Sequence, residues 1–234
     1  MSRSIQKGKA VSGFINSEFS NQLFEINAKP GHFFSLRYRS KTLFPKLTIE
    51  SGTDVVEQST CFNNRCQISR VDGERFRGID LMVRVTPVSG FGNFKLKLID
   101  HGNLNSITKK VIRNTNKQRR QRGLDPLTGN KRLQMAAQAH VDDMDAVGRY
   151  LAHESSDGRQ LRDRIDEVNY QWRYIAENAA TGQGSPQDVV ESWMNSPGHR
   201  ANIISKDVSE IGVGFAIDNQ TGATYWIQNF GKPA

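Results

Sequence analysis

The feature of this sequence that most constrains its fold is a change in the spacing of apolar residues near His101. Before that point, segments such as 32–38 and 94–98 partly alternate apolar and polar side chains, as half-buried strands do. After it, Ile107 and Val111 begin a run with the period of an amphipathic helix. The change predicts two domains with separate cores, and 234 residues are enough for two.

The first domain, residues 1–102, is expected to be an all-β sandwich. Its strand-like segments are short, rich in aromatic and β-branched residues, and show no helical period. The domain has an opening Gly13-Phe14 strand, the turn Ala28-Lys29-Pro30-Gly31 and the closing run Gly90-Phe91-Gly92-Asn93-Phe94-Lys95-Leu96. In these features it resembles the bacterial pre-peptidase C-terminal domain, a small secreted β-sandwich.

The two cysteines, Cys61 and Cys66, flank an Asn63-Asn64 pair that suits a two-residue hairpin turn. Such a hairpin would place Cys61 opposite Cys66, which permits a disulfide. A disulfide would indicate an oxidising location, and two reduced thiols are the alternative. No other Cys or His lies nearby in the sequence to complete a metal site with this pair.

The formal net charge of +8 raises the question of nucleic-acid binding. Residues 1–102 hold 15 Lys and Arg against 9 Asp and Glu, and residues 103–234 hold 17 against 15, so neither half is extreme. The densest basic cluster lies on a predicted helix and lacks interleaved aromatic residues for base stacking. It consists of Lys109, Lys110, Arg113, Lys117, Arg119, Arg120 and Arg122. A solvated helix face is favoured over nucleic-acid binding, and an acidic surface or anionic lipid remains open.

The second domain, residues 106–234, is expected to be an α+β layer sandwich, with helices followed by strands. Gly123 is placed to end the first helix, Asn130 to cap the second, and Ser185-Pro186 to begin a later one. The apolar runs near the C-terminus are the best strand candidates. His140 falls on the apolar face of the second helix and is expected to be a core or boundary residue with its hydrogen bonds satisfied.

Several motifs of this domain follow one another over about residues 106–230, and one of them is His153 before Ser155-Ser156-Asp157-Gly158. The others are Asn116-x-x-Arg119-x-x-x-Gly123-Leu124-x-Pro126-Leu127, Leu133-x-x-Ala136-Ala137-x-x-His140-x-x-x-Met144, Ala176-Glu177-Asn178, Trp193-Met194-Asn195-Ser196-Pro197-Gly198-His199-Arg200-x-Asn202-Ile203, Gly212-Val213-Gly214 and Tyr225-Trp226-x-Gln228-x-Phe230-Gly231. In this order they resemble the bacterial type of the CAP superfamily, the module shared by cysteine-rich secretory proteins, antigen 5 and pathogenesis-related proteins. The resemblance implies an α-β-α sandwich with a cleft lined by two His and two acidic residues.

By motif position, the resemblance assigns His153, Glu177 and His199 to this cleft. Ser196 stands where relatives have the second acid, and Asp157 is a candidate replacement for it. Two facing imidazoles could share Zn²⁺ or another divalent cation, and a carboxylate nearby could orient a bound water. For Glu177 a structural tether is favoured, and for the two His ligand binding and a structural role are both open.

The resemblance implies a bacterial protein that is secreted, periplasmic or on the cell surface and binds a lipid, a cell-wall polymer or another protein. Metal-assisted hydrolysis of a peptide or ester, with Glu177 as base, is the alternative, and a purely structural role is the third. The sequence lacks zincin and Gly-x-Ser-x-Gly signatures, so binding is favoured over catalysis. It has no apolar run of transmembrane length, and its first residues lack the apolar core of a secretory signal. The chain is therefore expected to be cytoplasmic or to have lost a signal before its numbering begins.

Overall fold

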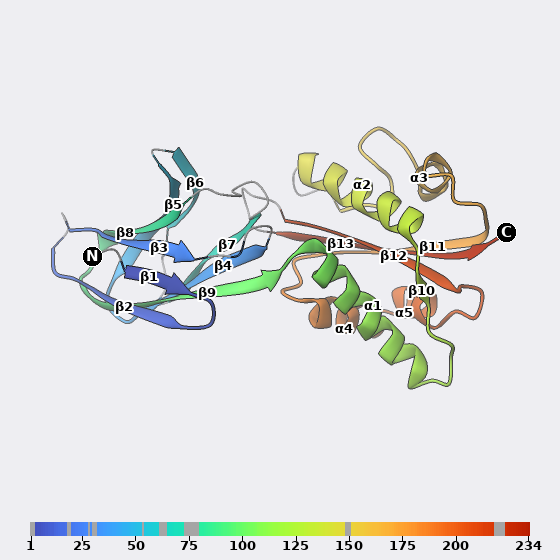
Figure 1. The fold of residues 1–234 in the computed structure, drawn as a ribbon, viewed down its shortest axis with the longest axis horizontal. Helices are drawn as coiled ribbons and strands as arrows, with labels where there is room; N and C mark the ends of the chain where they lie inside the picture. The colour runs from blue at the N-terminus through green and yellow to red at the C-terminus, as the bar shows by residue number, and fades with distance from the viewer. Residues whose placement is uncertain are drawn as a thin grey trace. The chain divides into compact units, whose positions relative to one another are not determined.

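The protein is described by a computed structural model that covers residues 3–17, 20–27, 29, 32–52, 54–60, 65–72, 80–147, 151–217 and 223–234. The chain forms two compact units, each with its own sheets and core (Figure 1). One takes in Met1–Asn103, and the other takes in Leu104–Asp218 with Ala223–Ala234.

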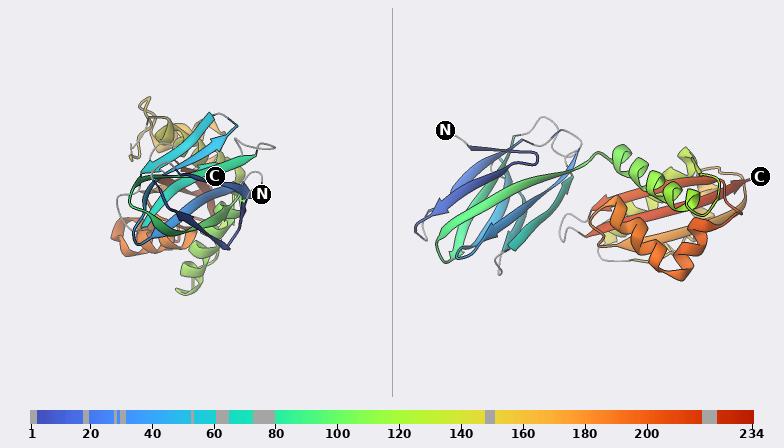
Figure 2. Two further views of the ribbon diagram at one scale, coloured as in Figure 1. Left: turned by 90° about the vertical axis from the view of Figure 1, so that its left-hand side faces the viewer. Right: turned by 90° about the horizontal axis from the view of Figure 1, so that it is seen from below.

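The first unit is a sandwich of two β-sheets (Figure 2). One sheet has the strand order β1-β3-β8-β5-β6 and the other has the order β2-β9-β4-β7. The strands are β1 Arg3–Gln6, β2 Ala10–Ile15, β3 Gln22–Asn27, β4 Phe33–Ser40, β5 Phe44–Ser51, β6 Asp54–Thr60, β7 Arg65–Asp72, β8 Leu81–Ser89 and β9 Gly92–Gly102. The structure confirms the predicted all-β sandwich, while the resemblance to the pre-peptidase C-terminal domain stays a prediction.

The core of this unit follows from alternation along its strands. On β9, Phe94 and Leu96 are buried, while Lys95 and Lys97 are exposed. The Phe94 ring meets Phe24 of the other sheet edge-on, with ring centroids 5.9 Å apart. Successive side chains of a strand point to opposite faces, so the same alternation that fills the core also sets a row of lysines outside it.

The predicted cysteine hairpin turns at Asn63-Asn64, which lie outside the described residues, but the strands on either side of it are described. β6 pairs with β5 in one sheet and β7 pairs with β4 in the other, so these two strands are not the arms of one hairpin. Strands in different layers cannot supply the cross-strand ladder on which the predicted geometry depended. Cys61 and the side chain of Cys66 lie outside the described residues, and the disulfide between them stays a prediction.

The second unit has three layers, as predicted. Its sheet has the order β10-β12-β13-β11, with α2 and α3 over one face and α1, α4 and α5 over the other (Figure 1). The helices are α1 Leu104–Arg120, α2 Lys131–Val147, α3 Leu161–Glu167, α4 Pro186–Asn195 and α5 Pro197–Ile204. The strands are β10 Thr128–Gly129, β11 Trp172–Thr181, β12 Glu210–Ile217 and β13 Thr224–Pro233.

The predicted helix ends are confirmed. Gly123 has a φ of 70° just after α1, a conformation that glycine adopts without steric cost. Asn130 Oδ1 accepts hydrogen bonds of 2.8 and 3.2 Å from the first turn of α2. The Ser185 side chain caps α4, which has Pro186 in its first turn. The sequence analysis did not predict α5, because it follows α4 after a single residue.

Two glycines of β12 allow α2 to lie directly on the sheet. A Cβ atom at Gly212 would lie 2.1 Å from backbone atoms of Leu133 and Gln134, and one at Gly214 would lie 2.3 Å from the carbonyl oxygen of Ala137. Residues two apart on a strand share a face, so both glycines serve the same helix. Their Gly-x-Gly spacing thereby fixes the distance between α2 and the strands that carry the site.

Candidate functional site

Glu177 lies in β11, at one edge of the sheet of the second unit. Its partner on the neighbouring strand is Asn229 of β13, which pairs on its other side with Gly212. The Glu177 side chain is only 2% exposed. A carboxylate buried to this extent is costly unless both oxygens have partners.

Both oxygens of Glu177 have partners. Nδ1 of His153 bonds Oε1 at 2.8 Å, and Nη2 of Arg164 donates to Oε2 at 2.8 Å. When the Asn229 amide is turned so that its oxygen accepts from Ala137 N, its nitrogen donates to Oε2 at 3.0 Å. The carboxylate is therefore held from three directions, which supports the predicted role of Glu177 as a tether.

Arg164 of α3 connects this carboxylate to the loop after α2. Its side chain is 2% exposed, and Nη1 donates to Ser155 Oγ and to the Arg159 carbonyl, both at 3.1 Å. Ser155 Oγ lies 3.3 Å from Nδ1 of His140, which is fully buried on α2. A single hydrogen-bonded network thus joins α2, α3 and β11, and the predicted core role of His140 is confirmed.

His153 is the exposed member of this network. Its side chain is 60% exposed, and since Nδ1 is bonded to Glu177, Nε2 is the ring nitrogen that remains to meet a ligand. The hydrogen bond to Glu177 raises the pKa of His153 and outweighs the effect of its partial burial. The imidazole is therefore held in one orientation, and its protonated form is more stable than that of an ordinary imidazole.

His199 lies in the first turn of α5 and is half-buried. Burial lowers its pKa, and the positive charge of His153 lowers it further, so the two imidazoles are electrostatic neighbours. Asn178 Nδ2 donates to the His199 carbonyl oxygen at 3.0 Å, and Asn202 Nδ2 donates to the Glu177 carbonyl oxygen at 3.1 Å. These amides fix α5 against β11. We call His153, Glu177 and His199 the imidazole edge.

The other two predicted site residues make none of the hydrogen bonds given above for Glu177 and His153. Ser196 is the junction between α4 and α5, where it is half-buried and its N–H donates to Trp193. Asp157 is exposed, and its Oδ2 accepts from Arg159 Nε at 2.7 Å. Its carboxylate is thus committed to Arg159, and this geometry gives no support to Asp157 as a replacement for the missing acid.

The predicted zinc site also lacks support. Within the described ranges, no group of three or more His, Cys, Asp or Glu is placed to hold a metal ion. Both oxygens of Glu177 are already bonded, so only the imidazoles of His153 and His199 remain as possible ligands. A zinc site in a protein has at least three protein ligands. The donor set therefore does not fit a resident zinc ion.

The sequence analysis missed Arg164, although a signal was present. Leu161, Ile165 and Val168 mark the apolar side of the predicted third helix, and Arg164 falls among them at the i+3 position. A cation on a buried face requires a buried partner, because its isolated charge would be too costly. The nearby motif offered Glu177 as that partner.

Comparisons with known proteins give a family and a fold. The family described as CAP, the cysteine-rich secretory protein family, matches residues 112–230. The uncharacterised protein YkwD of Bacillus subtilis (strain 168) is 34% identical over 127 residues, which are 54% of this chain and 48% of that protein. The chain thus spans about half the length of this relative.

Two solved structures share the fold. An outer surface protein from Borrelia burgdorferi has a TM-score of 0.50 and 22% identity, over 54% of this chain and 92% of that chain. An extracellular protein containing an SCP domain, from Bacillus anthracis str. Ames, has a TM-score of 0.50 and 16% identity, over 94% of this chain and 88% of that chain. Among the described residues, no helix is long and apolar enough to cross a membrane.

Proposed function

Because the chain belongs to the CAP, or cysteine-rich secretory protein, family, we propose that it is an extracytoplasmic protein that binds its ligand at the imidazole edge. The observation that carries the proposal is the exposed imidazole of His153, held through its Nδ1 by a buried carboxylate that is itself paired with a buried arginine. The outer-surface and extracellular structures that share the fold support the location.

The two imidazoles suggest the chemistry of the contact. Relative to an ordinary imidazole, the raised pKa of His153 shifts that ring toward a charged donor, while the lowered pKa of His199 shifts that ring toward its neutral form. A cation and a neutral donor or acceptor side by side suit a ligand that presents oxygen atoms, such as a lipid headgroup, a cell-wall polymer or a peptide carboxylate.

Binding accounts for the geometry better than hydrolysis. A general base must reach the proton that it abstracts, but the oxygens of Glu177 are turned toward His153 and Arg164 in a site that is 2% exposed. The described residues also provide no three-ligand metal group to activate water. A purely structural role would leave the exposure of His153 without a use.

The test is co-sedimentation of the full chain with two insoluble probes at pH 6 and pH 8. One probe is peptidoglycan freed of its anionic polymers, and the other is vesicles of phosphatidylcholine, which carry no net charge. We expect one probe to bind the chain, more tightly at pH 6, and His153→Gln to weaken that binding about tenfold or more. Lys110→Gln removes an exposed charge from α1 of the same unit and should change nothing.

Three outcomes would replace the proposal. Binding that is equal in the two variants would place the ligand away from the imidazole edge. If the chain sediments with neither probe at either pH, a structural role would be favoured. Soluble fragments released from peptidoglycan by the unmodified chain, and lost in His153→Gln, would favour the hydrolase.

A further inference from the structure

The four-stranded sheet of the first unit sets cations directly opposite one another. The backbone register pairs Arg39 of β4 with Lys95 of β9, and Arg37 with Lys97. Paired residues of an antiparallel sheet point to the same face, and all four side chains are exposed. The outer face of this sheet therefore carries a block of positive charge.

The described side chains of the sheet do not neutralise this charge. None of these four cations, nor Lys41 in the turn after β4, forms an ion pair with an acidic side chain that the structure describes. On β2, the residue opposite Lys95 is Ser12, which is uncharged. Like charges directly opposite each other destabilise a sheet, so an external anion would relieve a cost that is built into the fold.

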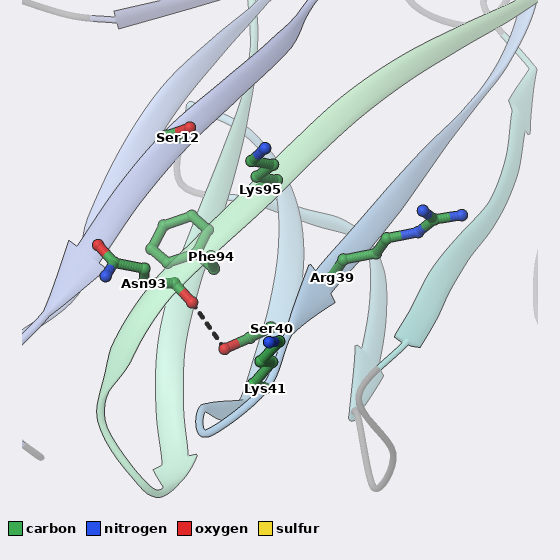
Figure 3. Close-up of a pocket in the computed structure, with 7 residues that line it drawn as sticks. All are labelled: Ser12, Arg39, Ser40, Lys41, Asn93, Phe94 and Lys95. Carbon is green, nitrogen blue, oxygen red and sulfur yellow. Dashed lines mark hydrogen bonds between the residues drawn. The ribbon is translucent and has the colours of Figure 1, made fainter.

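A pocket of ≈ 590 Å³ lies where this charge meets the end of the sandwich (Figure 3). It is lined by three cations, two hydroxyls, one amide and one aromatic ring. They are Arg39, Lys41, Lys95, Ser12, Ser40, Asn93 and Phe94. Ser40 Oγ donates to the Asn93 carbonyl oxygen at 2.7 Å, which fixes one wall. The arginine and two lysines supply the donors that bind a phosphate group.

Exposed apolar side chains gather at the same end. Phe14 is 53% exposed and pairs with Asn93 of the pocket wall, and Phe91 is 48% exposed in the turn between β8 and β9. That turn contacts the turn of Lys41, because Thr42 Oγ1 donates to the Phe91 carbonyl oxygen at 2.6 Å. We call Phe14 and Phe91 the apolar tip.

We propose that this end of the first unit docks onto the surface of an anionic phospholipid bilayer, with a headgroup phosphate in the pocket and the apolar tip in the headgroup layer. Cations near such a surface attract it through its negative potential, and amphipathic binding adds the burial of apolar side chains. The proposal does not rest on the imidazole edge, since every residue in it belongs to the first unit.

The apolar tip favours a bilayer over a soluble polyanion. A polymer or a nucleic acid would use the cations, but it would leave Phe14 and Phe91 in water. Proteins that bind single-stranded nucleic acid interleave several aromatic rings with their cations. Here the exposed rings of Phe14 and Phe91 lie at the end of the sheet, beyond the block of cations and not among them. A membrane surface is the occupant that uses both the charge and the apolar side chains.

The experiment measures partition of the full chain onto vesicles of phosphatidylglycerol and phosphatidylcholine, and onto phosphatidylcholine alone. We expect the chain to bind the anionic vesicles more tightly than phosphatidylcholine alone, and added salt to weaken this difference because it shortens the range of the electrostatic attraction. Arg39→Gln/Lys41→Gln/Lys95→Gln should reduce the partition coefficient on the order of 100-fold. Phe14→Ser/Phe91→Ser should reduce it about tenfold.

The control variant Lys109→Gln/Lys110→Gln/Arg113→Gln removes the same number of lysines and arginines from the exposed side of α1 and should bind as the unmodified chain does. The unfolding temperature of Arg39→Gln/Lys41→Gln/Lys95→Gln should be unchanged or higher, because the opposed cations Arg39 and Lys95 are gone. Equal loss in the control would overturn the proposal, as would full binding by the serine variant. Binding of an oligothymidylate that is tighter than that of the vesicles, with no effect of the serine substitutions, would assign the face to a soluble polyanion instead.

Discussion

The two units differ in where they keep their charged side chains. The core of the first unit consists of aliphatic and aromatic residues. On the outside of one of its sheets, Arg37, Arg39, Lys95 and Lys97 form no ion pair with an acidic side chain that the structure describes. The second unit buries Arg164 and Glu177 completely and uses them to hold one exposed imidazole. Exposed charge, as in the first unit, attracts a partner over a distance. Buried charge, as in the second unit, fixes the geometry of a contact.

The largest expected effect tests this difference directly. Arg164→Met leaves the buried Glu177 carboxylate without its main cation and should destabilise the second unit by about 3–5 kcal/mol. Arg84→Met in the first unit breaks a pair with Glu50 whose members are 36% and 16% exposed, and it should cost no more than about 1 kcal/mol.

Denaturant unfolding separates the two variants. Trp172, Trp193 and Trp226 all lie in the second unit, so tryptophan fluorescence reports on that unit alone. Calorimetry follows the transition of the first unit. Equal losses in the two variants would mean that burial does not distinguish the two ion pairs.

The next effect sharpens the comparison through packing. Gly214→Ala would place a methyl group 2.3 Å from the backbone of α2 and should cost the second unit about 1–3 kcal/mol or more. Gly198→Ala in α5 is the matched control, because nothing lies within 4 Å of its added Cβ and alanine favours a helix. Urea unfolding followed by fluorescence measures both, and a neutral Gly214→Ala would show that α2 does not lie as close to the sheet as described.

A smaller effect is expected when the units are separated. A chain of residues 104–234 should unfold cooperatively, with a stability by fluorescence that differs from that of the same unit in the full chain by less than about 1 kcal/mol, because each unit has its own core. Aggregation or a broad transition of the shorter chain would show instead that the two cores depend on each other.

The fold could be predicted further than the site. The change in the spacing of apolar residues distinguished the β-sandwich from the layered unit. Gly123, Asn130 and Ser185 predicted helix ends that the structure confirms. These signals are local, since each acts on the backbone of its own turn. The pairing of β6 and β7 is a long-range choice between two sheets, and the sequence between them did not reveal it.

The contacts of the site depend on residues far apart in the chain. The family motifs located His153, Glu177 and His199, but not the buried Arg164 that holds the carboxylate. The sequence analysis missed the cations on the outer face of the first unit's four-stranded sheet for a similar reason. Arg39 and Lys95 lie 56 positions apart and meet only through strand register, whereas the cluster on α1 is visible as a run of letters.

The pH dependence of stability follows from the same contacts. His153 has a raised pKa, so its contribution to stability is fully present below about pH 6.5 and is lost as the pH rises through its folded pKa. The pKa values of His140 and His199 are lowered, chiefly by burial, so their contributions are present above about pH 6.5 and are lost as the pH falls. The stability of His153→Gln relative to the unmodified chain should therefore be lowest under acid conditions.

The most direct test of the account is an NMR titration of the imidazoles of His153 and His199. We expect His153 to titrate above its ordinary value of about 6.5 and His199 below it, and Glu177→Gln should return His153 toward that value. Arg164→Met should leave the bond between His153 and Glu177 in place and keep the His153 midpoint high, provided that the unit is folded at the temperature used. If His153 titrates at or below its ordinary value and does not respond to Glu177→Gln, the carboxylate does not hold the imidazole, and the proposed presentation of His153 is wrong.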